Sequence, residues 1–145
     1  MTITKALTCL LIGLTLSGKV AAQQAKEFGD YTVYYSAVTT TFIEPDVAAA
    51  YQIVRAKDRA IINIAIRKRT DDTSVAVPAL IEGRSWDLFQ NRFLKFKEIR
   101  EQGAIYYIAD FDFSSEEYRF FNLNILPEGA ERSFELLFKQ KIYED

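Results

Sequence analysis

Apolar and polar residues alternate along most of the chain, and the alternation is strictest between Gly103 and Phe113. A period of two, rich in aromatic and β-branched residues, is typical of a β-strand with one buried face. This segment is therefore predicted to be a central strand. Its predicted core face consists of Ile105, Tyr107, Ala109, Phe111 and Phe113.

Six further segments have the same period of two, and turn residues separate most of them. Pro78 lies inside one of these segments and has no N–H to donate, so we expect that strand at a sheet edge or with a bulge. Gln102 and Gly103 are expected to form the tight turn of a hairpin that runs from Arg92 to Phe113. The six predicted strands are Tyr31–Phe42, Ala60–Lys68, Ser74–Glu82, Arg92–Glu101, Tyr118–Leu126 and Ser133–Tyr143.

About seven short strands predict an all-β fold, an antiparallel two-sheet sandwich of immunoglobulin-like type. A closed barrel of similar strand number is the alternative. One short helical connection is expected at about residues 45–51, because Pro45 suits the first position of a helix and Asp46 suits its positive end.

Two segments depart from the alternation. Gln23–Glu27 is polar and is expected to be a mobile lead-in to the domain. Gly83–Asn91 is the least regular part of the chain. Its large apolar residues, Trp86, Leu88 and Phe89, are expected to fold back onto the core.

The N-terminal residues have the pattern of a secretory signal peptide. Lys5 supplies a positive charge, residues 6–16 are mostly apolar, and small residues suit cleavage after Ala22. The apolar run of about eleven residues is too short to span a bilayer as a helix. We expect a signal-peptide helix over 1–22, a single β-sandwich domain over 26–145, a periplasmic location, and no transmembrane segment after cleavage.

Composition and charge disfavour several kinds of chemistry. The chain has no histidine, so the commonest general base and the commonest metal ligand are absent. Its single cysteine lies in the expected signal peptide, which leaves no disulfide in the mature protein. Cleavage removes two of 18 basic residues and none of 20 acidic ones, so the mature charge is 16 − 20 = −4. This balance disfavours nucleic acid as a partner, and no cofactor is expected.

Three long stretches of the chain resemble a known family. They are FGDYTVYYSAVTTTF, EPDVAAAYQIVRAKDRAIINIAI and KEIREQGAIYYIADF. They resemble DUF4426, a family of small secreted proteins of Gram-negative bacteria, and the resemblance covers about Lys26 to Tyr143. It implies a periplasmic β-rich domain, and it transfers no activity and no functional residue.

Acidic side chains gather around the turn that follows the central strand. Asp110, Asp112, Glu116 and Glu117 could together hold a hard cation such as calcium, which takes six to eight oxygen ligands. Their spacing matches no EF-hand loop, and the two aspartates fall on the polar phase of the strand. An ordinary solvated acidic face is the alternative interpretation.

Bulky residues also occur opposite the presumed core phase. Tyr34, Tyr106 and Ile108 would form an exposed apolar patch, and therefore a candidate binding surface, if that face meets solvent. The alternative is that the face is itself covered by the short helix or by the loop that contains Trp86. The most basic stretch is expected to be a solvated face, and it consists of Arg55, Lys57, Arg59, Arg67, Lys68 and Arg69.

Two functions remain open from the sequence. The first is a non-catalytic periplasmic module that binds a protein or a cell-envelope component through a sheet face or an edge strand, such as the edge that contains Pro78. The second is a carboxylate-dependent envelope hydrolase, which needs two converging carboxylates of perturbed pKa in a cleft. The chain carries no nucleophile motif, so the sequence favours the binding module.

Overall fold

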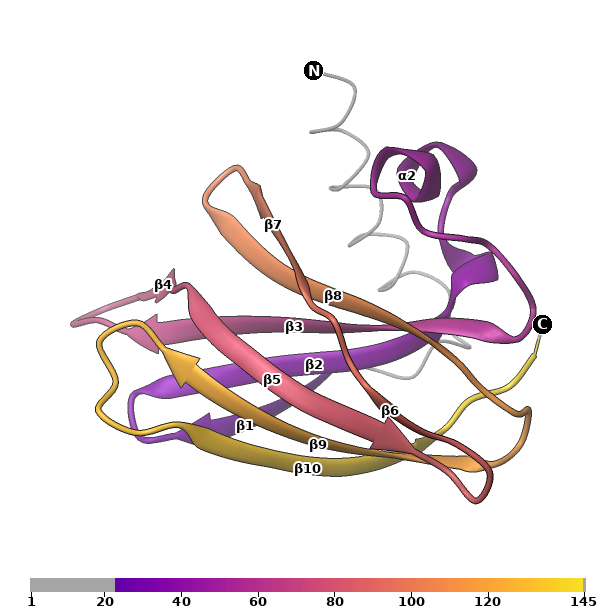
Figure 1. Ribbon diagram of the computed structural model, residues 1–145. Helices are drawn as coiled ribbons and strands as arrows, with labels where there is room; N and C mark the ends of the chain where they lie inside the picture. Colours follow the sequence, from indigo (N-terminus) through magenta and orange to yellow (C-terminus); the bar gives the residue numbers. More distant parts are fainter. Residues whose placement is uncertain (1–22, 145) are drawn as a thin grey trace.

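Two antiparallel β-sheets pack face to face in the structure, a computed structural model that describes residues 23–144 (Figure 1). The predicted all-β, two-sheet sandwich is therefore confirmed. The predicted signal peptide at 1–22 lies outside the described residues.

The two sheets have different sizes. Sheet A contains, in spatial order, β1 (Gln24–Phe28), β2 (Tyr31–Thr39), β3 (Arg59–Arg69), β8 (Ala104–Asp112) and β7 (Lys97–Glu101), and the short β4 (Ser74–Ala76) also pairs with β3. Sheet B contains β10 (Phe134–Lys141), β9 (Tyr118–Pro127), β5 (Ala79–Trp86) and β6 (Asn91–Phe93). A 3-10 turn (Thr40–Phe42) and α2 (Pro45–Ala50) connect β2 to β3.

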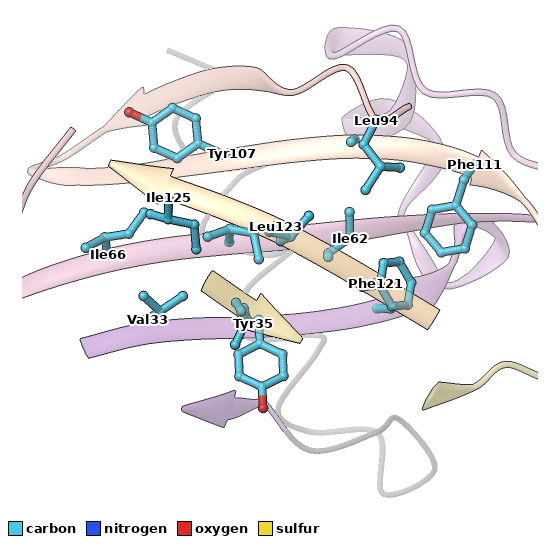
Figure 2. Close-up of a cluster of buried hydrophobic side chains, with 14 of the residues drawn as sticks. Val33, Tyr35, Ile62, Ile66, Leu94, Tyr107, Phe111, Phe121, Leu123 and Ile125 are labelled. Carbon is cyan, nitrogen blue, oxygen red and sulfur yellow. The ribbon is translucent and has the colours of Figure 1, made fainter. Parts of the chain in front are cut away.

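The main core lies between the sheets and uses the predicted inner faces of the strands (Figure 2). Phe121, Leu123 and Ile125 of β9 are fully buried against sheet A. Phe121 meets Phe111 of β8 edge-on, with ring centroids 5.3 Å apart, and stacks on Phe138 of β10 at 4.6 Å. Each such side chain contributes about 1.5–3 kcal/mol by leaving water. The alternation in the sequence therefore identified this core correctly.

A second apolar cluster lies on the outer side of sheet A, where α2 packs (Figure 1). Pro45 begins the helix as predicted, and Gln52, at φ 58°, lies just beyond its end. Within the described residues, no helix is both long enough and apolar enough to cross a membrane. The buried members of this cluster are Val38, Ile43, Val47, Ala48, Ile61, Ile99 and Ile108.

Two of the predicted strands are each divided between the sheets. The expected strand Ser74–Glu82 is β4 in sheet A followed by β5 in sheet B, and Pro78 lies at the crossing. The prediction of a sheet edge at Pro78 is confirmed, because β4 pairs only with β3, and β6 pairs with β5 only at Arg84–Trp86, at the other end of the strand. The expected strand Arg92–Glu101 likewise becomes β6 and β7. The apolar phase changes at both crossings, since Leu94 packs in the main core whereas Ile99 packs in an outer cluster, but so short a change of phase did not separate the strands in the sequence.

The hairpin predicted from Arg92 to Phe113 is accordingly shorter and consists of β7 and β8. Gln102 and Gly103 form its turn with φ of 48° and 79°, the left-handed pair that a tight two-residue turn requires. The polar lead-in expected at 23–27 is also wrong, because Gln24–Phe28 pairs with β2 as an edge strand. Backbone hydrogen bonding needs no apolar pattern, and only Phe28 packs inward, stacked on Phe134 at 4.8 Å.

Candidate binding surface

The three residues of the predicted apolar patch lie on the outer face of sheet A but do not form an exposed patch. Ile108 is 4 % exposed in the cluster under α2, so the expectation that it meets solvent is wrong. Tyr106 packs partly buried against the same cluster, and this burial raises the pKa of its phenol. Tyr34 borders a polar hollow of about 500 Å³ that Arg67 and Arg69 also line. The alternative interpretation, that the short helix covers this face of the sheet, is therefore correct at Ile108.

The acidic cluster is organised by arginine. Asp110 forms an ion pair with Arg59, and Asp112 lies 3.8 Å from Arg59 and 3.5 Å from Arg92. Glu116 and Glu117 are exposed in the loop between β8 and β9. Within residues 23–144, no three acidic side chains are grouped so that they could hold a metal ion. The contacts of the two aspartates are those of paired surface charges.

Several cations of the basic stretch bind partners within the fold. Arg55 donates to the carbonyl oxygens of Ile43 at 2.8 Å and Thr41 at 3.1 Å. Arg67 donates to the hydroxyl and the carbonyl oxygens of Ser74. These arginines therefore tie loops and strands to one another, and the stretch forms no continuous cationic face.

The outer face of sheet B carries the aromatic side chains that the sandwich leaves uncovered. Strand register places Trp86 beside Phe120, and Phe120 beside Lys139. No second layer covers this face in the described part of the chain (Figure 1). We refer to this set, together with the exposed Leu88 and Phe89 of the adjoining β5–β6 turn, as the aromatic surface of sheet B, and its strand residues are Arg84, Trp86, Phe93, Tyr118, Phe120, Lys139 and Lys141.

Other aromatic rings or cationic groups lie over the faces of the Trp86 and Tyr118 rings. Trp86 and Phe120 stack with centroids 5.6 Å apart and planes within 12°, and the Arg84 guanidinium lies 5.2 Å from the Trp86 ring. The Nζ atoms of Lys139 and Lys141 lie 4.7 and 5.0 Å from the centroid of Tyr118. Cations over ring faces are attracted by the ring quadrupole. The surface is thus a packed aromatic and cationic array rather than a set of open ring faces.

The turn between β5 and β6 carries the most exposed part of this surface. Leu88 is 82 % exposed and Phe89 is 75 % exposed at its tip, and Phe93 on β6 is 86 % exposed. These are the three most exposed large apolar side chains in the described residues. The expectation that Leu88 and Phe89 fold back onto the core is therefore wrong. Single exposed apolar residues are ordinary, whereas a contiguous group of them marks an interaction site.

A buried polar network holds the base of this turn. Arg119 on β9 donates from Nε to the Ser85 hydroxyl at 2.6 Å and from Nη1 to Asp87 Oδ2 at 2.8 Å. Asp87 Oδ1 accepts from the backbone N–H groups of Phe89 and Gln90, both at 2.7 Å. The side chains of Arg119 and Asp87 are only 1 % and 3 % exposed. The network therefore makes a rigid frame under an exposed apolar tip.

The ionisation of the network follows from these contacts. Burial by itself would raise the pKa of Asp87, but the two backbone N–H groups and the Arg119 charge outweigh it and hold the pKa below its usual value. Burial lowers the pKa of Arg119, and Asp87 opposes this effect. Both groups are charged at neutral pH, which suits a structural ion pair.

Part of this surface could have been found in the sequence. Because Phe121 and Leu123 face inward, the same alternation places Tyr118 and Phe120 outward. No comparable sequence pattern indicated that Leu88 and Phe89 are exposed, because their exposure depends on β6 pairing back onto β5 in a tight turn. The inward-phase residue Arg119 was the remaining sequence clue, since a charge in a core phase requires a buried partner.

At the opposite end of the sandwich, Tyr107 joins the sheets. Its hydroxyl accepts from the backbone N–H of Ala79 at 2.8 Å and donates to Glu98 Oε2 at 2.9 Å. A neighbouring hollow of about 400 Å³ is lined by Glu98, Glu128 and apolar residues of the β5 and β9 ends. The bonds from Arg100 and Tyr107 lower the pKa of Glu98. A general acid needs a raised pKa, so this shift has the wrong direction for that role.

Comparisons with known proteins agree with this architecture. A family model described as a domain of unknown function, DUF4426, matches residues 25–145. The chain is similar to the crystal structure of a DUF4426 family protein from Pseudomonas aeruginosa PAO1, with 31% identity and a TM-score of 0.72. That match covers 85% of this chain and 96% of the other. A search of curated proteins gave no match.

Proposed function

The chain belongs to the DUF4426 family, and we propose that it is a non-catalytic periplasmic protein that binds a protein or cell-envelope component through the aromatic surface of sheet B. One observation carries the proposal. A buried ion pair between Arg119 and Asp87 holds a turn whose tip consists of two exposed apolar side chains, Leu88 and Phe89.

The energetics of this turn support a binding role. Burying a charged pair is costly, and folding alone could be served as well by apolar residues of similar volume. Leaving two large apolar side chains in water likewise gives the free protein no stability. A turn that has both a buried ion pair and exposed apolar side chains suits binding to a partner. The partner would cover the apolar side chains, and a pre-organised turn loses little conformational entropy on binding.

The chemistry of the carboxylates supports a role without catalysis. Asp87 and Glu98 both have lowered pKa values, and each is held by an arginine. Lowered carboxyl pKa values suit ion pairs, whereas the acid of a glycosidase needs a raised one. The alternative of a carboxylate-dependent envelope hydrolase is therefore the weaker of the two proposals.

Site-specific photocrosslinking in living cells tests the proposal. Benzoylphenylalanine is introduced in place of Phe89 at the tip, and in a matched chain in place of Leu80, which is 71 % exposed at the other end of the same sheet. Cell fractionation and mass spectrometry of the processed N-terminus check the periplasmic location and cleavage after Ala22.

The two crosslinking positions should give different results. We expect covalent adducts from position 89 and none from position 80. Equal yields from both positions, or no adduct from either, would contradict binding through the aromatic surface. Recovery of the protein from the cytoplasm with residues 1–22 attached would contradict the proposed location.

A further inference from the structure

We propose that the aromatic surface of sheet B binds the surface of a phospholipid bilayer, with Leu88 and Phe89 inserted among the lipids. This inference rests on the proposed binding function and names its ligand class. It follows from the shape of the tip, the chemistry around it and the contacts already made by the rings.

The shape of the tip suits a fluid partner. Asp87 and Gln90 close the turn through a hydrogen bond from the Asp87 N–H to the Gln90 carbonyl at 2.9 Å, so Leu88 and Phe89 project at its apex. A protein partner would need a matching hollow, and stable protein interfaces bury about 800 Å² on each side. A bilayer needs no such match, because lipids rearrange around an inserted side chain.

The side chains behind the tip suit the interfacial region of a bilayer. Trp86 and Tyr118 carry polar groups on large apolar rings, the combination that favours the boundary between lipid and water. Phe93 on the neighbouring strand adds an apolar side chain to the same face. Apolar area that enters the headgroup region sets the strength of such interfacial binding.

The charges next to these rings complement anionic headgroups. The cross-strand rows nearest the turn carry Arg84, Lys139 and Lys141 and contain no carboxylate, and the exposed Glu116, Glu117 and Glu144 lie beyond the ends of these rows, in the segments before Tyr118 and after Lys141. Glu82 and Glu135 lie in the next row, which continues away from the tip. Each cation near an anionic bilayer contributes about 1 kcal/mol at the surface, which favours an orientation with the outer face of these rows, and the turn at its edge, toward the lipid.

The ring contacts argue against a glycan at this surface. Sugars stack on open aromatic faces, but Trp86 carries Phe120 and Arg84, and Tyr118 carries two lysine ammonium groups. A glycan would have to displace these groups before it could stack. Edges of rings and exposed aliphatic side chains remain available, and these suit acyl chains.

Vesicle flotation with the protein purified from the periplasm tests the inference. Vesicles of phosphatidylethanolamine and phosphatidylglycerol are compared with vesicles of phosphatidylcholine alone. Trp86 is the one tryptophan of the sequence, so its fluorescence reports this surface directly. The double variant Leu88→Ser/Phe89→Ser removes the tip, and Leu80→Ser/Val54→Ser is the matched control at exposed apolar positions elsewhere.

The expected results separate the apolar and charged contributions. The unchanged protein and the control should float with the anionic vesicles, and Trp86 emission should shift to shorter wavelength. The tip variant should lose about tenfold or more in partition coefficient, since two apolar side chains no longer leave water. Lys139→Glu/Lys141→Glu should weaken binding to anionic vesicles by a larger factor than binding to neutral vesicles, because only the anionic headgroups lose an electrostatic attraction.

The outcomes distinguish this inference from the proposed function. Equal flotation of the tip variant and the unchanged protein, or no flotation of either, would overturn lipid binding. If a polypeptide adduct at position 89 accompanies absent flotation, the binding function stands with a protein partner instead. If position 89 gives no adduct and no vesicle binds, both proposals are wrong.

Discussion

The Arg119 guanidinium lies 2.8 Å from Asp87 Oδ2 in the interior of the sandwich, with both side chains almost fully buried. Arg119 comes from an inner-phase position of β9, and Asp87 begins the turn between β5 and β6. This ion pair therefore connects the core to the exposed tip, and its removal should affect both stability and the turn.

Replacing Arg119 with Met should destabilise the protein by about 3–5 kcal/mol, because Asp87 and Ser85 are left buried without their partner. Urea unfolding followed by circular dichroism measures this change. A double-mutant cycle with Asp87→Ala provides the control, since the two single losses should not add. Additive losses would mean that the pair acts through packing rather than through its charges.

Low pH should decrease the free energy of unfolding, because Asp87 becomes protonated. A carboxyl group with a lowered folded pKa contributes stability that is fully present above its unfolded pKa of about 3.9 and is lost as pH falls through the folded value. Unfolding free energies of the protein and of Asp87→Asn should therefore converge as pH falls from about 6 toward 2. Glu98 also has a lowered pKa, so the unfolding free energy of Asp87→Asn should still decrease to some extent as pH falls. A constant difference across this range would contradict the lowered pKa of Asp87.

Replacing Tyr107 with Phe should destabilise the protein by about 1–3 kcal/mol, because the Ala79 N–H loses its acceptor and the link between the sheets is broken. Tyr51→Phe is the matched control. The Tyr51 hydroxyl also meets a carboxylate, Glu101 Oε2 at 3.2 Å, but it accepts from no buried N–H. Thermal unfolding should show a larger loss for Tyr107→Phe, and equal losses would contradict a special role for the bridge.

Replacing Gly83 with Ala should destabilise the protein by about 1–3 kcal/mol or more through overpacking. An added Cβ would overlap Leu123 Cδ2 and would lie 2.5 Å from the Asn122 carbonyl oxygen. The backbones of β5 and β9 would have to separate at that point. An unchanged urea midpoint for Gly83→Ala would show that the two strands tolerate the shift.

Calcium should leave the melting temperature unchanged, because Asp110 and Asp112 already form ion pairs with Arg59 and Arg92. Thermal unfolding is compared with added calcium, with chelator and without either. The variant Arg59→Met frees the carboxylates and shows whether the arginine is what excludes the cation. A rise in melting temperature for the unchanged protein would restore the hypothesis of a metal site.

The alternation of residues determined the fold class and most of the core. Ile105, Tyr107 and Phe111 on β8, and Phe121 and Leu123 on β9, face inward as predicted. Such buried positions can be predicted from the sequence, because a strand with one face in a core must alternate apolar and polar residues. The short helix after Pro45 was readable in the same way, from residue types that suit a helix N-terminus.

Only the tertiary structure decided how these strands are shared between the sheets and which faces stay open. The crossings at Pro78 and Leu94 lie inside segments that each resemble a single strand in the sequence, and their positions depend on pairing between distant segments. Burial of Ile108 depends on where α2 packs, and exposure of Leu88 and Phe89 depends on the tight turn that joins β5 to β6. The sequence determined which faces are apolar. Long-range packing determined which apolar faces are covered, because covering them requires contacts that no local pattern encodes.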